Sequence, residues 1–275
     1  MKRISQTVPL QYDTIFSPFS AAEFDAALDF LASKGFTGIE LAVAHPKSVD
    51  AENLLKKLAT TCLVVTTLST GQAYALDGLF LSSFDESVRN AAADLIKGHV
   101  DLSVVIGRPP VTIGLLRGKL ENGEKTALLE NFRQALVPCV EYAQKSGVSL
   151  QIEPISHEET VLINTVNEAL EFILALGNPE NVGILYDTFH SFNEDGDMVE
   201  AIRAAGKKIT NVHLADSHRG LPGYGEIDFG AVGQALQANG YEGAYALETL
   251  VTPDRDFINK YCYESIINNI QGVFT

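Results

Sequence analysis

Four residues in the second half of the chain combine the side chains and the spacing of a metal-binding site. Three are carboxylates and one is an imidazole, and each ends or lies within a short apolar run typical of a strand: Glu153, Asp187, His213 and Glu248. The intervals between them, 34, 26 and 35 residues, match a strand followed by a helix. In a parallel barrel the last residues of successive strands converge on one face, so these side chains would meet there. Such a set favours one divalent ion that prefers oxygen ligands, namely Mn²⁺, Mg²⁺ or Co²⁺.

Each of these residues also has an ordinary structural explanation when it is considered alone. Glu153, which precedes Pro154, could be a surface residue at a strand end, and Asp187 could cap the following turn. His213 could be a core histidine bonded to a carbonyl group, or a ligand whose ring is oriented by Asp216 or by a carbonyl group. Together the four residues favour a metal site, because buried ligands at the ends of four consecutive strands need a cation to neutralise them.

Two glutamates beside one metal ion also suggest a reaction. A hydroxyketone that binds the ion through adjacent oxygens has an acidified carbon-bound proton between those oxygens. One carboxylate can remove that proton from one face while the other returns it from the opposite face, which inverts the stereocentre through an enediolate. We therefore interpret Glu153 and Glu248 as the catalytic acid/base pair of a metal-dependent enzyme.

These residues need a scaffold of alternating strands and helices, and the hydrophobic pattern predicts one. Eight short apolar runs indicate strands at 4–8, 38–43, 63–69, 102–107, 149–153, 182–186, 209–214 and 244–248. The first helix is expected to open with a capping box, Ser20 and Glu23, and the others to cover 48–59, 85–97, 124–146, 165–176, 197–205, 229–239 and 254–271. Long connections follow the third and fourth strands, at 76–83 and 108–123, on the side where barrel enzymes build their sites. The sequence predicts one α/β domain over residues 1–275, a (β/α)₈ TIM barrel.

The composition disfavours several other classes of protein. The net charge of −15, from 35 acidic and 20 basic residues, disfavours nucleic acid as a partner, because phosphate binding requires clustered Lys and Arg. No window approaches about 18 consecutive apolar residues and the N-terminus has no apolar signal segment, so we expect no membrane partner. The cysteines are odd in number and widely spaced, which favours reduced core residues of a cytoplasmic protein: Cys62, Cys139 and Cys262.

Several stretches of the chain resemble a known family. The most distinctive are Ile152-Glu-Pro154, Asp187-Thr-Phe-His190 and His213-Leu-Ala-Asp-Ser-His-Arg219, and further matches lie at 69–78, 113–118, 159–160, 163–165 and 222–223. Together they spread from about residue 35 to 250. In these stretches the chain resembles the xylose-isomerase-like sugar isomerase/epimerase superfamily. Within it, the chain is most similar to the metal-dependent ketose 3-epimerases and a related 5-keto-gluconate epimerase.

The resemblance implies a role for particular residues. It places the metal ligands on Glu153, Asp187, His213 and Glu248, and the acid/base pair on the two glutamates. Substrate contacts carry over to Glu159, His190 and Arg219, whereas Gln72 and Arg117 match the keto-gluconate group. Arg117 and Arg219 together would bind the carboxylate of a keto-sugar acid. The chain departs from the family pattern at Ser156-His157 and at Glu226, positions expected near the distal end of the substrate.

The expected function is therefore epimerisation of a ketose or keto-sugar acid. The expected partner is this small-molecule substrate, and the protein could form a homo-oligomer. Aldose–ketose isomerisation of the hydroxypyruvate type, or isomerisation of a sugar phosphate, would use the same site. A non-catalytic sugar-binding protein is a further alternative, which the intact ligand set disfavours. A metallohydrolase related to abasic-site endonucleases would need more histidines at strand ends than the sequence offers.

Overall fold

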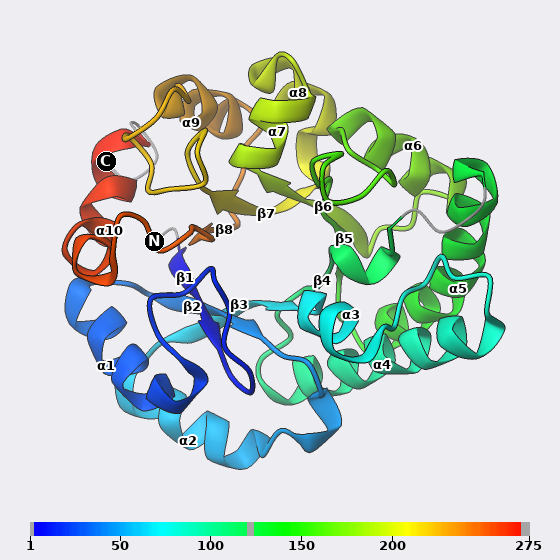
Figure 1. Ribbon diagram of the computed structural model, residues 1–275, viewed down its shortest axis with the longest axis horizontal. Coiled ribbons are helices and arrows are strands. Elements are labelled where there is room, and N and C mark those ends of the chain that lie inside the picture. The colour runs from blue at the N-terminus through cyan, green and yellow to red at the C-terminus, as the bar shows by residue number, and fades with distance from the viewer. Residues whose placement is uncertain (1–2, 120–123, 271–275) are drawn as a thin grey trace.

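Eight parallel strands close into a barrel in the computed structural model, which describes residues 3–119 and 124–270 (Figure 1). Each strand pairs with the next one along the chain, and the last pairs with the first. The strands are β1 (Arg3–Pro9), β2 (Gly38–Ala42), β3 (Val64–Ser69), β4 (Val111–Ile113), β5 (Leu150–Ile152), β6 (Val182–Asp187), β7 (Ile209–Leu214) and β8 (Ala244–Leu247). The predicted (β/α)₈ TIM barrel is confirmed.

Helices surround the barrel and connect the end of each strand to the start of the next (Figure 1). They are α1 (Phe24–Lys34), α2 (Ala51–Thr61), α3 (Gly71–Asp77), α4 (Glu86–Val105), α5 (Lys125–Lys145), α6 (Val166–Ala175), α7 (Thr188–Glu194), α8 (Met198–Ala205), α9 (Phe229–Ala238) and α10 (Arg255–Asn269). Short 3₁₀ helices are η1 (Ala21–Glu23), η2 (Pro46–Ser48), η3 (Leu115–Arg117) and η4 (Gly206–Lys208). Residues 120–123 of the predicted fourth connection, and Gln271 of the last predicted helix, lie outside the described residues.

Seven predicted strands are confirmed to within one residue at each end, but the fourth prediction was wrong. The apolar run that begins at Leu102 continues the buried face of α4, a 20-residue helix capped by Asp85. Val105, on the opposite face, is 53% exposed, as the helical period requires. The helix ends before Gly107, which has a φ of +105°, and β4 follows only at Val111–Ile113. A short apolar run does not reveal by periodicity alone whether it is a strand or part of a buried helix.

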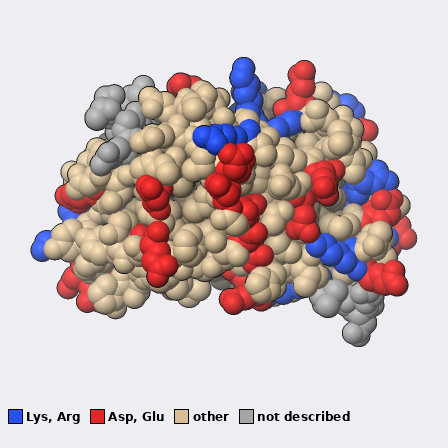
Figure 2. All heavy atoms as spheres, turned by 90° about the horizontal axis from the view of Figure 1, so that it is seen from above, with Lys and Arg blue, Asp and Glu red and all other residues tan. Residues whose placement is uncertain are grey.

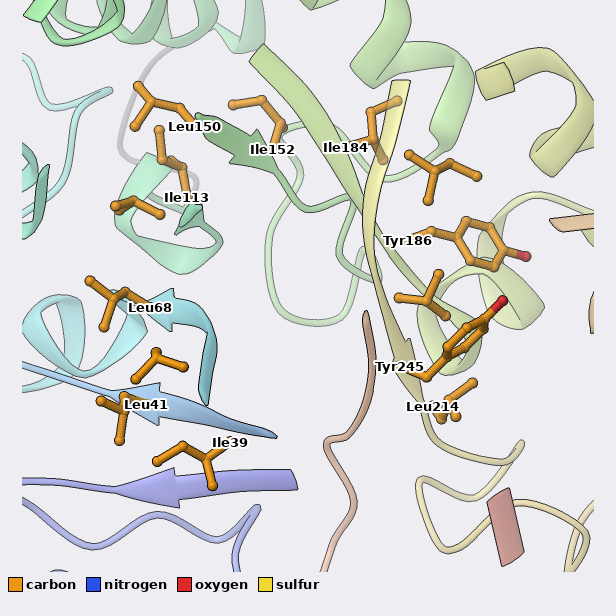
Figure 3. Close-up of a cluster of buried hydrophobic side chains, with 14 of the residues drawn as sticks. Ile39, Leu41, Leu68, Ile113, Leu150, Ile152, Ile184, Tyr186, Leu214 and Tyr245 are labelled. Carbon is orange, nitrogen blue, oxygen red and sulfur yellow. The ribbon is translucent and has the colours of Figure 1, made fainter. Parts of the chain in front are cut away.

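The large buried side chains fill the layer between the strands and the helices. Figure 3 shows them around the barrel, from Ile39 and Leu41 of β2 to Tyr245 of β8. Successive side chains of a strand point to opposite faces, so Glu40, between Ile39 and Leu41, points into the barrel. Each strand therefore packs against helices with one face and presents the other to the barrel interior.

The middle of the barrel interior is polar. The side chain of Gln151 in β5 donates to the hydroxyls of Thr67 in β3 and Thr112 in β4, at 2.8 and 2.7 Å. Thr210 in β7 donates to Gln151 at 2.8 Å. Since β5 pairs with neither β3 nor β7, the bonds of Gln151 to Thr67 and Thr210 cross the interior. Gly183 of β6 leaves room beside Thr210. The layer fixes the relative positions of the strands just before their carboxyl ends.

The acidic surface, the helices and the cysteines also bear on the expectations from composition. Acidic side chains are spread over the face of the molecule shown in Figure 2. Within residues 3–119 and 124–270, no helix has both the length and the hydrophobicity needed to cross a membrane. All three cysteines are free, and Cys139 and Cys262 are buried as expected. Cys62 is exposed, which corrects the core position expected for it, because it caps the end of α2 in a left-handed conformation.

Candidate metal centre and active site

The predicted ligands converge at the carboxyl ends of β5 to β8. One possible ligand atom from each residue lies within 4.8 Å of all the others, for the set Glu153, Asp187, His213 and Glu248. Nδ1 of His213 lies 3.4 Å from Oε1 of Glu153, 3.4 Å from Oε2 of Glu248 and 3.6 Å from Oδ2 of Asp187. Parallel pairing in register, with Asp187 opposite His213, produces this convergence. Sequence spacing alone indicated which residues the barrel would bring together.

Asp187 uses its two carboxylate oxygens for different tasks. Oδ1 accepts hydrogen bonds from the backbone N–H groups of Phe189 and His190, at 2.7 and 3.2 Å, and so caps α7. Oδ2 is buried and has no hydrogen-bond partner in the part of the chain that the structure describes. The cap therefore holds the second oxygen in a fixed direction beside His213.

Glu40 orients His213, a role that the sequence had suggested for Asp216. Oε2 of Glu40 lies 2.6 Å from Nε2 of His213, and both side chains are almost completely buried. Asp216 instead accepts backbone N–H groups of the loop after β7, among them those of Gly223 and Gly225. A glutamate in the middle of the apolar strand 38–43 was the signal that could have identified this residue.

The donor set fits a divalent cation. Within the described residues, Nδ1 of His213 and Oδ2 of Asp187 are buried without a hydrogen-bond partner. Buried polar atoms are rarely left unpaired, because each loses its hydration without compensation. Nδ1 can offer a lone pair because Glu40 accepts the proton of Nε2. Oxygen atoms with one imidazole nitrogen suit Mn²⁺, Mg²⁺ or a similar ion.

The electrostatics of the cluster make its two glutamates unequal. Burial raises the pKa of Glu153 to about 7. Burial also opposes ionisation of Glu248, but His213 and Arg219 outweigh it and lower the pKa of that carboxyl. Burial alone would lower the pKa of His213, yet the surrounding carboxylates raise it well above its ordinary value. Protons and a metal ion would therefore compete for the same cluster.

A cavity of about 310 Å³ reaches the cluster from the surface. Its lining comes mainly from the loops after β1, β3, β4, β5, β6 and β7, and includes Phe16, Gln72, Leu115, Glu153, Ile155, Glu159, His190, Arg219 and Glu248. Four of the five predicted substrate contacts thus lie around one pocket.

His190 is held in one tautomer. The backbone N–H of Ser156 donates to Nδ1 of His190 at 3.1 Å, and the Ser156 hydroxyl lies 2.8 Å from the same nitrogen. Because a backbone N–H can only donate, Nδ1 is an acceptor and the neutral ring carries its proton on Nε2. Burial lowers the pKa of His190, which keeps the ring neutral. Ser156, at a position where the chain departs from the family pattern, therefore acts on His190.

Arg219 is held between carboxylates and aromatic rings. Its Nη1 donates to Glu159 at 2.7 Å, and its Nη2 lies 3.4 Å from Oε2 of Glu248. The guanidinium lies 4.3 Å from the ring centre of Phe16 and 5.0 Å from that of Phe189. Cation–π contact on two sides fixes the plane of the guanidinium.

Gln72 lines the pocket and contains a buried acceptor without a partner among the described residues. Its Nε2 donates to the backbone carbonyl of Tyr12 at 2.6 Å, which assigns the opposite side of the amide to oxygen. Oε1 is buried and has no hydrogen-bond partner among the described residues. A hydroxyl group in the pocket could satisfy it.

Arg117 does not lie in the pocket, which corrects the substrate contact expected for it. The side chain is 0% exposed. Its guanidinium donates only to backbone carbonyl groups, those of Ile113, Gly114, Glu153, Leu162 and Ile163. Because the side chain is fully buried, is absent from the cavity lining and uses each of its nitrogens to bind backbone, it is not placed to bind a substrate carboxylate.

The chain matches known proteins over most of its length. A family model described as the xylose isomerase-like TIM barrel matches residues 28–259. An L-ribulose 3-epimerase from Mesorhizobium japonicum is 33% identical over 243 residues, covering 86% of this chain and 78% of the relative. A ketose 3-epimerase from Arthrobacter globiformis is 30% identical over 227 residues, covering 80% and 76%.

Solved structures agree with this similarity. The structure of an L-ribulose 3-epimerase, 29% identical, superposes with a TM-score of 0.79 and covers 95% of this chain and 86% of the other. A D-psicose 3-epimerase, crystallised in the presence of D-fructose, has a TM-score of 0.83 over 98% of this chain and 100% of the other. At 20% identity, the second similarity shows the fold alone.

Proposed function

Because the chain belongs to the xylose isomerase-like TIM-barrel family, we propose that it is a divalent-metal-dependent ketose 3-epimerase of one catalytic domain. The observation that carries the proposal is the pair Glu153 and Glu248, two buried carboxylates in one candidate metal centre at the base of a sugar-sized cavity. The epimerase activities named for the relatives support the same reaction.

The two glutamates are suited to opposite proton transfers. Glu248 would remove the proton at C3 as a carboxylate, beside Arg219, whose Nη2 lies 3.4 Å from its Oε2. Glu153, the second glutamate of the centre, would return a proton to the other face. The reverse reaction exchanges these roles. A bound divalent ion would acidify that proton by polarising the neighbouring carbonyl and hydroxyl oxygens.

The remaining polar side chains would orient the sugar. Nε2–H of His190 can donate to one substrate oxygen, and the Arg219 guanidinium to another. Gln72 can accept from a hydroxyl. Glu159 forms an ion pair with Arg219 at 2.7 Å and so positions the guanidinium. Glu159 also lines the pocket.

We propose a neutral ketose rather than a keto-sugar acid as the substrate. The acid required two arginines, but Arg117 is bound to backbone carbonyls and Arg219 already pairs with Glu159 and Glu248. Among the described residues that line the cavity, Arg219 is the only Lys or Arg. A carboxylate or phosphate would thus enter a pocket rich in negative charge without a free cation, which costs free energy.

The proposal also covers the metal ion, the cellular location and the partners of the protein. Mn²⁺ is our choice among Mn²⁺, Mg²⁺ and Co²⁺, because it accepts both carboxylates and imidazole. The odd number and wide spacing of the three cysteines support a cytoplasmic location. We expect homo-oligomerisation from the resemblance, and no nucleic-acid partner because of the net charge of −15. We expect no membrane partner because the sequence has no long apolar run.

The test is NMR of the protein with metal in D₂O against L-ribulose, D-fructose, a keto-sugar acid and a ketose phosphate. We expect deuterium at C3 and a new epimer peak for a neutral ketose. A new aldehyde product would instead show aldose–ketose isomerisation, and no exchange with metal bound would favour a binding role. Glu153→Gln and Glu248→Gln should each slow epimerisation about 10²- to 10⁴-fold. The exposed Glu52→Gln, outside the pocket, is the control.

A further inference from the structure

The guanidinium of Arg117 is a buried charge without a carboxylate bonded to it. Its Nε donates to Leu162 at 2.6 Å, and its Nη2 donates to Ile163 at 3.1 Å. Its Nη1 donates to the carbonyl of Glu153 and reaches two more carbonyls, in Ile113 and Gly114. Burial lowers the pKa of Arg117 to about 10, so the group stays protonated at neutral pH. A buried cation is tolerated only where its donors are satisfied.

The five acceptors belong to three different segments. Two lie at the end of β4, one is the backbone of the catalytic candidate Glu153, and two lie in the loop of residues 154–165 between β5 and α6. Ile163 has a φ of +60°, a left-handed conformation that is rare for a β-branched residue. Such a backbone persists only where surrounding contacts enforce it, and Arg117 bonds to the carbonyl of this residue.

The 154–165 loop in turn carries two groups that set the pocket. Ser156 binds Nδ1 of His190, and Glu159 binds Arg219. A second tie supports the same loop, because the hydroxyl of Thr160 donates to the carbonyl of Gly118 at 2.8 Å.

We propose that Arg117 is a positioning residue: by gathering five carbonyl groups, it fixes the backbone of Glu153 and the 154–165 loop in the geometry that the reaction needs. The inference rests on the proposed function for its catalytic consequence only. A displacement of about 1 Å at a reacting group can cost about 100-fold in rate. Loss of the Arg117 side chain should therefore lower kcat by more than a loss of folded protein would explain.

The experiment compares Arg117→Lys and Arg117→Ala with Arg89→Lys as the matched control. Arg89 also donates to a backbone carbonyl, that of Ser83 at 2.7 Å, but lies in α4 outside the pocket. Lysine keeps the charge yet has only three donors on one atom, so it cannot reproduce the five-carbonyl arrangement. We expect kcat of Arg117→Lys to fall at least about 10-fold. Amide deuterium uptake should rise within 154–165 and stay unchanged in α9 and α10.

Small-molecule rescue separates positioning from loss of stability. Millimolar guanidinium should restore part of kcat in Arg117→Ala, whereas urea, its neutral counterpart, should not. Neither should activate the wild-type protein. Wild-type kcat in Arg117→Lys with unchanged uptake at 154–165 would overturn the inference, as would increased uptake throughout the barrel without rescue.

Two outcomes remain informative if an assay fails. If Arg117→Ala does not fold, Thr160→Val tests the same loop through its second tie and should give a smaller effect of the same kind. If the wild-type protein epimerises no ketose, the proposed function fails. Deuterium uptake at 154–165 in Arg117→Lys against Arg89→Lys then still decides whether Arg117 fixes the loop.

Discussion

Glu40 binds Nε2 of His213 at 2.6 Å and leaves Nδ1 of the same ring directed at three carboxylates. A carboxylate in this place selects the tautomer and strengthens the ring as a ligand. Its second oxygen has no hydrogen-bond partner among the described residues, so the hydrogen bond to His213 is its main compensation for burial.

We predict that Glu40→Gln weakens metal binding about 10- to 100-fold, because the amide can still accept from Nε2–H but carries no charge. Competition with a chelator measures the affinity directly, without any enzymatic assay. Glu52→Gln, at an exposed ion pair on α2, should leave the affinity unchanged. Equal affinities in Glu40→Gln and wild-type protein would show that the ring needs no carboxylate partner.

At the residue scale, candidate ligands were predicted from polar residues at the ends of predicted strands. This criterion identified all four residues of the candidate ligand set. It missed Glu40, because a residue inside a strand acts on the site only once the barrel has closed. It misplaced Arg117, since nothing in a loop sequence tells whether an arginine faces solvent, a ligand or the backbone. Ser156 was noticed as a departure from the family pattern, but its bond to His190 requires the folded loop.

Directly after β4, the backbone at Gly114 approaches the end of β5 more closely than a side chain at that position would allow. A Cβ at Gly114 would lie 2.6 Å from Oε2 of Glu153, a distance that real Cβ atoms essentially never show. The glycine therefore leaves the space in which the Glu153 carboxylate sits.

Gly114→Ala should accordingly displace the Glu153 carboxylate and reduce kcat about 100-fold, with a much smaller loss of melting temperature. Steady-state kinetics and thermal unfolding of the same preparation check both parts. Gly230→Ala in α9, where the new Cβ would contact only the Asp228 carboxylate at 3.2 Å, serves as the control. Wild-type kcat in Gly114→Ala would mean that the carboxylate moves freely.

At the element scale, hydrophobic periodicity predicted strands where they are long and β-branched. It failed at β4, which has three residues and follows a longer apolar run belonging to α4. The capping boxes were easier to recognise, because their chemistry is local. Ser20 with Glu23 forms one, as predicted.

The pairing of β1 with β8 closes the barrel, and an ion pair outside it links the same two units. Glu23, at the start of the first helical segment, binds Arg255 of α10 at 2.9 Å, so the first and last units of the barrel are joined (Figure 1). The backbone N–H of Ser20 and then the Arg255 guanidinium lower the pKa of Glu23 to about 2.

This lowered pKa predicts a pH dependence of stability. The contribution of Glu23 is fully present above the unfolded pKa of about 4.5 and is lost as the pH falls toward the folded value of about 2. Glu23→Gln should therefore melt below the wild-type protein at pH 7, and the difference should shrink between pH 4.5 and pH 3. Thermal unfolding at pH 7, 5, 4 and 3 tests this, and a difference that grows on acidification would contradict it.

Metal binding should also stabilise the whole molecule. At about 100 times Kd, a ligand that binds only the folded protein contributes about 2.7 kcal/mol, or roughly 5–10 °C in Tm for a chain of this size. The gain should be larger at pH 8 than at pH 6, because the raised pKa values of Glu153 and His213 let protons compete with the ion. His213→Ala should abolish it. Full stabilisation of that variant by metal would place the ion elsewhere.

The polar layer formed by Gln151 with three threonines has a consequence for thermodynamics. Exposure of apolar surface raises the heat capacity on unfolding, whereas exposure of polar surface lowers it. A barrel whose middle is hydrogen-bonded should thus have a smaller heat capacity change than one filled with valine and leucine. Its free energy of unfolding should vary less steeply with temperature, so the protein should stay folded over a wider thermal range.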